Sequence, residues 1–170
     1  MHISFLPDVI VPHLTDVTPD LLREFSVTAL LLDFDNTVVP YTTDLPTEAV
    51  ERWFSDMRAA GVFLCVVSNT RKARAPLFCE RRGVPCVSGS RKPFQKGIRE
   101  ALSRFSLDPA HTALVGDQIY TDVLGANAGG LTSILITPIR LHNVWLKLRR
   151  GLEEPFICAA RRRRRGFPQK

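Results

Sequence analysis

The feature of this chain that most constrains its fold is a set of short apolar runs with almost no polar residue inside them. Four such runs cover residues 27–32, 62–67, 112–115 and 131–136. A strand with one face in water alternates apolar and polar residues, whereas a continuous apolar run of about four to eight residues is typical of a strand buried on both faces. The runs therefore indicate a parallel sheet covered by helices.

Segments of helical character separate these runs. They cover residues 46–60, 72–82, 93–105 and 121–128, and several end at glycines such as Gly61 and Gly83. A short helix before the first run is expected to begin at Pro19, with Thr18 as its N-cap. With a brief strand at 84–87, this order predicts an α/β fold, a Rossmann-like three-layer sandwich with a mostly parallel five-stranded sheet.

The charge of the chain divides it into two parts. Residues 1–139 contain 13 Lys and Arg against 15 Asp and Glu, whereas residues 140–170 contain 10 against 2. A length of 170 residues needs only one domain. We expect a folded domain at 1–139, including a short N-terminal segment, and at 140–170 an amphipathic helix with a basic, disordered tail.

Several functional classes are disfavoured by the sequence. No apolar run approaches the roughly 20 residues that cross a bilayer, and Pro7 and Asp8 interrupt the N-terminal stretch where a secretory signal would need continuous apolar residues. The four cysteines show neither C-x-x-C spacing nor alternation with histidines, which disfavours a zinc site and a disulfide framework. We expect a cytoplasmic protein with reduced thiols.

Two carboxylates, Asp33 and Asp35, follow the first buried run at a spacing that directs both side chains to one side. Such a pair favours a divalent cation or a shared proton. One carboxylate could attack phosphorus while the other donates and removes protons. The alternative is a turn in which Asp35 and Asn36 bond to loop amides.

Three further polar clusters also follow strands. Ser68-Asn69-Thr70-Arg71 leads into a helix and resembles an anion site, although Ser and Asn are also ordinary helix caps. Lys92 follows the short strand and could neutralise phosphoryl charge, or it could simply be solvated. Gly116-Asp117 ends the next strand, with Asp122 beyond it. Asp117 suits Mg²⁺, Asp122 could orient it, and both could instead be turn and capping residues.

Together these clusters lie where parallel sheets bind ligands, at the carboxyl ends of the strands. Asp33-Phe34-Asp35-Asn36-Thr37, Ser68-Asn69, Lys92-Pro93 and Gly116-Asp117 with Asp122 resemble the four motifs of the haloacid dehalogenase (HAD) superfamily. Within that superfamily the chain is similar to the YqeG-like branch of subfamily IIIA, from about Pro7 to Pro138.

The resemblance implies an enzyme, a phosphatase that works through a phospho-aspartate. Asp33 would be the nucleophile and Asp35 the acid/base, while Ser68 and Lys92 hold the phosphoryl group. Mg²⁺ would be bound by Asp33, the main-chain carbonyl of Asp35 and Asp117, with Asp122 supporting the site. The further residues that we expect to contact the substrate are Thr37, Asn69 and Arg71.

The intervals between Asp35, Ser68 and Lys92 leave no room for a folded cap domain, so the site is expected to be open. The YqeG-like branch is similar to mitochondrial phosphatases that dephosphorylate phosphatidylglycerophosphate, and a lipid head group would suit an open site. The alternatives are the same chemistry on a soluble phosphate ester or phosphoprotein, and a non-catalytic protein that binds RNA or a protein partner on the same scaffold. No DNA binding is expected.

The C-terminal segment raises a related question. Apolar residues recur there at helical spacing, with basic residues alongside and Arg161 to Arg165 behind them; the apolar set is Leu141, Val144, Trp145, Leu148 and Leu152. Residues 140–165 could lie on an anionic membrane, where each basic group contributes about 1 kcal/mol. The alternative is a helix that packs this stripe against the domain.

Overall fold

The computed structural model describes residues 4–140 and 144–165, with side chains described for all of these except 144–150 and 162–165. Its centre is a six-stranded sheet in which every pairing is parallel, in the order β1-β6-β5-β2-β3-β4. The strands are β1 (Val9–Val11), β2 (Ala29–Leu32), β3 (Phe63–Ser68), β4 (Cys86–Ser88), β5 (Thr112–Gly116) and β6 (Thr132–Ile136).

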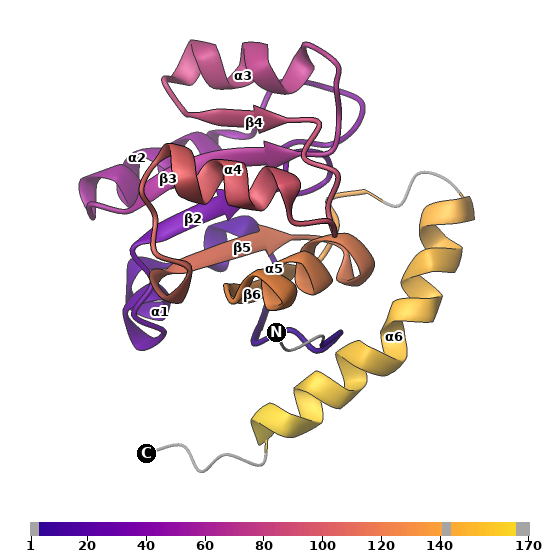
Figure 1. Cartoon of the computed structure of the whole chain (residues 1–170). Coiled ribbons are helices and arrows are strands. Elements are labelled where there is room, and N and C mark those ends of the chain that lie inside the picture. The colour runs from indigo at the N-terminus through magenta and orange to yellow at the C-terminus, as the bar shows by residue number, and fades with distance from the viewer. Residues whose placement is uncertain (1–3, 141–143, 166–170) are drawn as a thin grey trace.

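Helices cover both faces of this sheet. They are α1 (Pro19–Glu24), α2 (Glu48–Ala59), α3 (Arg74–Arg82), α4 (Lys96–Arg104), α5 (Leu124–Gly129) and α6 (Val144–Arg165), with short helices η1 (Leu14–Asp16), η2 (Pro109–His111) and the π-helix η3 (Ile119–Val123). Helices α4 and α5 lie in front of the sheet in Figure 1 and α2 lies behind it. The predicted α/β three-layer class is confirmed.

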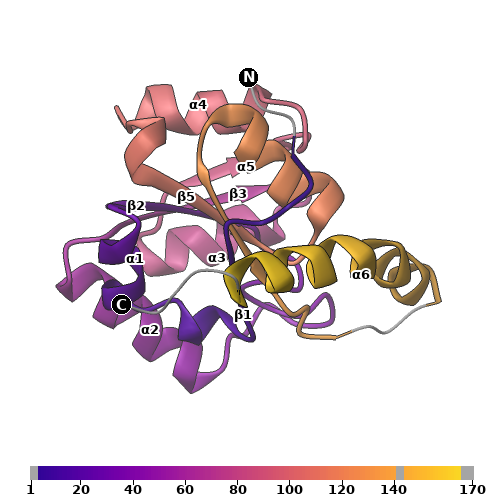
Figure 2. The ribbon, with the colours of Figure 1, turned by 90° about the horizontal axis from the view of Figure 1, so that it is seen from below.

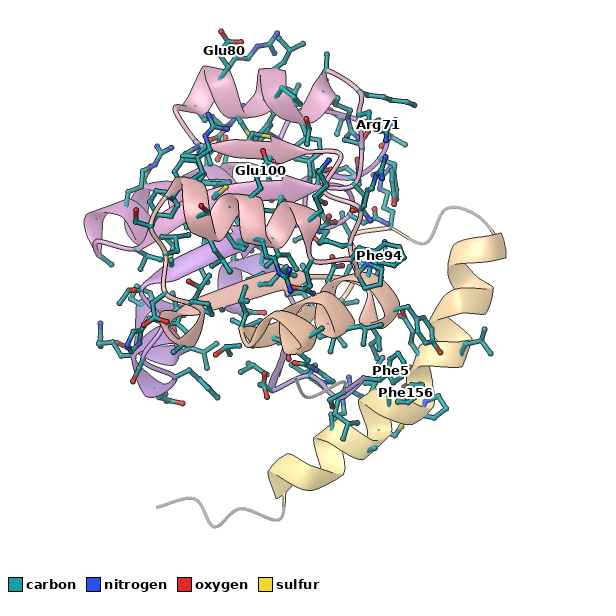
Figure 3. All side chains as sticks on the ribbon, in the orientation of Figure 1. Phe5, Arg71, Glu80, Phe94, Glu100 and Phe156 are labelled. Atoms are coloured by element: carbon teal, nitrogen blue, oxygen red, sulfur yellow. The ribbon has the colours of Figure 1, made fainter. Side chains whose placement is uncertain are left out.

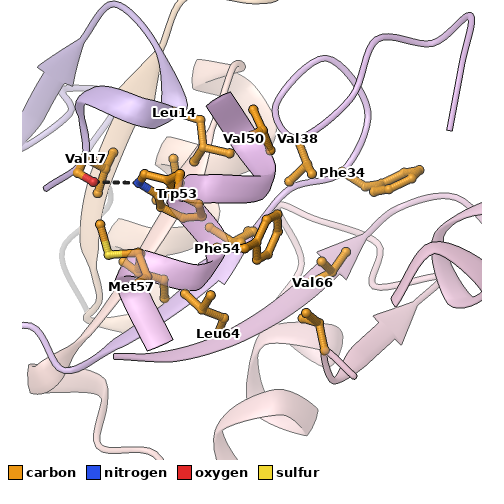
Figure 4. Close-up of a cluster of buried hydrophobic side chains, with 14 of the residues drawn as sticks. Leu14, Val17, Phe34, Val38, Val50, Trp53, Phe54, Met57, Leu64 and Val66 are labelled. Atoms are coloured by element: carbon orange, nitrogen blue, oxygen red, sulfur yellow. Dashed lines mark hydrogen bonds between the residues drawn. The ribbon is translucent and has the colours of Figure 1, made fainter. Parts of the chain in front are cut away.

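Two hydrophobic cores hold these layers together. Alternate residues of β2 point to opposite faces: Leu30 and Leu32 join the core under α2 and α3, and Leu31 joins the core under α4 and α5. In the first core Trp53 Nε1 donates a 2.7 Å hydrogen bond to the carbonyl of Val17, which satisfies its one polar atom (Figure 4). Because both faces are buried, the strands contain continuous apolar runs.

The strand count differs from the expectation of five. Strand β1 was not predicted, because three residues are too short to stand out as a run; it is completed by pairing with β6, as in the register Val9↔Ile134. The predicted cap of α1 is present, since Thr18 Oγ1 accepts a hydrogen bond from the amide of Leu21. The helix expected at 121–128 is divided into η3 and α5.

Helix α6 lies along the outside of the domain, beside η3 and the N-terminal strand (Figures 1 and 2). Among its residues 151–161, whose side chains are described, Glu153, Ile157 and Ala160 are buried, whereas Leu152 is 59% exposed. Leu152 therefore does not pack against the domain, as the second interpretation of the apolar stripe would require. Leu141 and the side chains of the other stripe residues lie outside the described part of the chain. Across the described residues, no helix is both long and apolar enough to cross a membrane.

Candidate active site

The site forms where the three central strands end. Strand β2 lies between β3 and β5, with Leu32 in register with both Val66 and Val115. The next residue, Asp33, donates its amide to the carbonyl of Val115 at 2.9 Å, so the chain leaves the sheet beside β5. A hollow of about 220 Å³ opens at this edge. Its lining residues are Asp33, Asp35, Tyr41, Ser68, Asn69, Thr70, Gln118 and Thr121.

Three buried carboxylates meet next to this hollow, and Asp33 among them lines it. Asp33, Asp117 and Asp122 each offer one oxygen, and these oxygens lie within 4.8 Å of one another. Gly116 makes this approach possible, because a Cβ at that position would lie 2.3 Å from Asp122 Cγ. Hard oxygen donors at this separation suit a small divalent cation. The side chain of Asp35 is not part of the cluster.

Lys92 lies in the loop after β4, and its side chain contacts two of these three carboxyl groups. Its Nζ lies 2.6 Å from Asp33 Oδ1 and 2.8 Å from Asp122 Oδ1. Burial raises the pKa of Asp33 to about 7, even though Lys92 acts to lower it. Burial alone would lower the pKa of Lys92, but Asp122 and Asp33 outweigh it and the pKa lies above its usual value. The site thus holds a buried Lys92 ammonium between the carboxyl groups of Asp33 and Asp122.

Asn69 fixes the loop that carries Lys92. Its Oδ1 accepts hydrogen bonds from the Lys92 amide at 2.6 Å and from Ser90 Oγ at 2.8 Å, while its Nδ2 donates to the Lys92 carbonyl at 3.0 Å. Asn69 also lines the hollow. Its observed bonds position Lys92, and a contact with substrate stays a prediction.

Asp35 is held by a residue that sequence reasoning missed. Arg74, at the start of α3, is ion-paired with Asp35 and with Asp44, and its guanidinium also donates to the carbonyls of Pro40 and Thr43. Burial raises the pKa of Asp35, and the charge of Arg74 opposes that rise. Arg74 therefore joins the acid/base candidate to the loop that borders the hollow.

The remaining predicted residues lie at different distances from this centre. Ser68 is buried at the end of β3 and its Oγ accepts from the Thr70 amide at 3.2 Å. Thr37 is also buried, but it lines a neighbouring cavity, and its Oγ1 has no hydrogen-bond partner among the described residues. Arg71 is exposed and packs beside Gly89. Of these three, the structure brings only Ser68 to the hollow.

A second missed residue lies on α6. Glu153 is 2% exposed, and its Oε1 accepts a hydrogen bond of 3.0 Å from the Ile119 amide, at the start of η3. No local pattern marks Glu153, because it sits in a basic segment beside the exposed Glu154.

Comparison with known proteins shows the family of the chain. A model of the HAD-hydrolase-like family matches residues 89–138. The chain is 32% identical over 160 residues to the probable phosphatase YqeG of Bacillus subtilis, and this match covers 94% of the chain and 93% of that protein.

Solved structures share the fold at low sequence identity. An uncharacterised protein from Listeria monocytogenes superposes with a TM-score of 0.54 at 15% identity, over 76% of this chain and 99% of that one. The cobalt-bound deoxy-D-mannose-octulosonate 8-phosphate phosphatase of Haemophilus influenzae superposes with a TM-score of 0.52 at 9% identity, over 80% and 90% of the two chains. These likenesses support the fold assignment.

Proposed function

Since the chain belongs to the HAD superfamily of phosphatases, in its YqeG-like branch, we propose that it hydrolyses a phosphomonoester through a phospho-aspartate formed on Asp33, with Mg²⁺ as its cofactor. The observation that carries the proposal is that Asp33, which lines the hollow, lies together with Lys92 and the carboxylates of Asp117 and Asp122. Nucleophile, cation and metal ligands must meet in this way for phosphoryl transfer.

Asp33 is the proposed nucleophile. Its Oδ1 is bonded to Lys92, while its carboxylate borders the hollow where a phosphate would enter. Attack on phosphorus forms the acyl phosphate and breaks the bond to the ester oxygen, which leaves as an alcohol. Lys92 lies where it can balance the charge of the phosphoryl oxygens, and Ser68 borders the same space.

Asp35 is the proposed acid and base. It lines the hollow, and its side chain is 18% exposed. A pKa raised by burial suits a carboxyl group that must carry a proton at the leaving oxygen. The same group, once deprotonated, takes the proton of the water that attacks the acyl phosphate. Arg74 holds this side chain at the mouth of the hollow.

The carboxylates fit a magnesium ion. Asp33 and Asp117 would hold it, and Asp122 would orient the site through its bonds to Lys92 and to the Gln118 amide. The main-chain carbonyl of Asp35 is the further ligand that the family resemblance implies. When bound, the ion would neutralise phosphoryl charge.

The test of this function is hydrolysis of a generic aryl phosphate. We expect turnover that requires Mg²⁺ and is lost in Asp33→Asn and in Asp117→Asn. Asp20→Asn is the matched control, because Asp20 is an exposed carboxylate on α1. Acid quenching during turnover should trap phosphate bound covalently to the wild type, at no more than one per chain, and none on Asp33→Asn. Unchanged turnover in Asp33→Asn would remove the catalytic assignment.

For the substrate, phosphatidylglycerophosphate is the leading candidate. Tyr41 lines the hollow and is exposed, and the exposed side chains of Phe94, Arg71 and Arg91 lie within two residues of Asn69 or Lys92 in the sequence. Figure 3 places Phe94 and Arg71 on the same side of the molecule. Exposed basic and apolar side chains of this kind would suit an anionic phosphate ester with apolar chains. Basic residues of the 140–165 segment would add a peripheral membrane contact.

The substrate is tested with vesicles that contain phosphatidylglycerophosphate, run beside a panel of soluble phosphate esters and a phosphopeptide. We expect the lipid to be preferred, with a rate that falls as salt rises. Phe94→Ser should lower the lipid rate and leave aryl phosphate hydrolysis intact. A preference for a soluble ester, with no effect of salt or of Phe94→Ser, would favour the soluble alternative while leaving the catalytic assignment in place.

A further inference from the structure

The C-terminal helix α6 contacts the loop that carries the acidic cluster. Ile157 is fully buried and packs with Ile119 and Val123 of η3. Phe156 lies 6.2 Å from the ring of Tyr120 and 5.3 Å from that of Phe5, between centroids (Figure 3). Helix α6 therefore covers the outer side of η3 with an apolar contact.

Two hydrogen bonds also join α6 to η3 within this apolar contact. Glu153 accepts the Ile119 amide at 3.0 Å, and the Tyr120 hydroxyl donates to the Leu152 carbonyl at 3.2 Å. The first amides of a helix lack partners within the helix and carry partial positive charge. The Glu153 carboxyl oxygen supplies the missing partner to one of these amides, inside a contact that is otherwise apolar.

The opposite side of η3 belongs to the active site. Asp122 lies within η3, where its Oδ2 accepts the Gln118 amide at 3.2 Å and its Oδ1 lies 2.8 Å from Lys92 Nζ. Asp117 comes two residues before Ile119. A shift of the Ile119 amide would therefore move the backbone at Asp117 and Asp122, which are two and three residues away, and with it both carboxyl groups.

We propose that Glu153 is a positioning residue for the metal-binding loop, and that α6 is a working part of the catalytic domain. By holding the Ile119 amide, Glu153 sets the path of the backbone between Asp117 and Asp122 and so preorganises their carboxylates. The proposal rests on the metal site of the proposed function. It assigns no contact with substrate to Glu153, which acts through η3.

The experiment measures Mg²⁺ binding to the full chain by titration calorimetry, without substrate. Glu153→Leu removes the acceptor and should weaken Mg²⁺ affinity by about 10- to 100-fold, as for other residues that orient metal ligands. Glu153→Gln keeps an acceptor oxygen and should lose less. Glu154→Leu is the matched control: its neighbouring side chain is exposed, so affinity should not change.

Activity on an aryl phosphate separates positioning from general stability. We expect Glu153→Leu to need more Mg²⁺ for half-maximal rate while its kcat at saturating Mg²⁺ stays near that of the wild type. A lower melting temperature with unchanged Mg²⁺ affinity would make Glu153 merely structural and overturn the proposal. If Glu153→Leu does not fold, Glu153→Asp carries the same comparison, because its carboxylate is one methylene too short to keep the bond.

A further variant separates a failure of the Glu153 proposal from a failure of the metal-site assignment on which it rests. Asp117→Asn should abolish Mg²⁺ binding whatever residue occupies position 153. If Asp117→Asn binds Mg²⁺ as the wild type does, the metal assignment itself fails. If Asp117→Asn loses binding while Glu153→Leu stays within twofold of the wild type, only the positioning role is overturned.

Discussion

Arg74 and Asp35 form an ion pair across the mouth of the active site, between residues 39 positions apart in the chain. The same guanidinium is bonded to Asp44 and to two carbonyls of the segment 40–43. The arginine thus orients the acid/base candidate and at the same time pins the loop that borders the hollow. A conservative change cannot reproduce this forked geometry, because a lysine has a single charged nitrogen.

We therefore expect Arg74→Lys to lower kcat about tenfold or more, as part of the 10²- to 10⁴-fold that a positioned acid/base contributes. Proteolysis within 40–44 should become faster, since the loop loses its anchor. Arg81→Lys, on an exposed face of the same helix, is the control. Wild-type kinetics in Arg74→Lys would contradict a positioning role.

Asp35→Asn should slow both halves of the reaction. The leaving oxygen loses its proton donor, and the water that attacks the acyl phosphate loses its base, so kcat should fall about 10²- to 10⁴-fold. With an aryl phosphate whose leaving group needs no proton, the phospho-Asp33 species should accumulate. Rapid-quench sampling measures it, and prompt phosphate release would contradict the assignment of Asp35.

Lys92→Met tests the electrostatics of the cluster. It removes a buried ammonium that neutralises Asp33 and Asp122. Breaking a buried ion pair in this way typically costs about 3–5 kcal/mol of folding free energy. Mg²⁺ should recover part of that loss, because it binds only the folded state and supplies positive charge. Urea unfolding with and without Mg²⁺ measures both effects, and equal destabilisation in the two conditions would argue against a shared cation site.

Gly116→Ala tests the close approach that builds the metal site. The added Cβ would lie 2.3 Å from Asp122 Cγ, so Asp122 must move. We expect a loss of about 1–3 kcal/mol in stability from overpacking, together with weaker Mg²⁺ binding. Gly151→Ala is the control, because a Cβ there meets no atom within 4 Å. A Gly116→Ala protein with wild-type Mg²⁺ affinity would show that Asp122 need not be held in place.

Much of this protein could be predicted from local sequence. Strands buried on both faces must be apolar throughout, so β2, β3, β5 and β6 stand out as runs. Because parallel strands place their carboxyl ends along one edge, the polar residues after those runs had to come near one another. For that reason Asp33, Ser68, Lys92 and Asp117 were candidates before their distances were known.

The tertiary structure alone decided which side chains touch. Strand β1 forms by pairing with β6 at the edge of the sheet. Its three residues are too few to give a signal in the sequence. Arg74 and Glu153 look like ordinary helix charges, yet each is bonded to a group more than thirty residues away. Asn69 was expected to contact the substrate, which stays a prediction, and only the tertiary structure showed that its amide also holds the backbone of Lys92. Periodicity reports which face of an element is buried, whereas a polar partner is chosen by packing between elements, and that choice is made only when the chain folds.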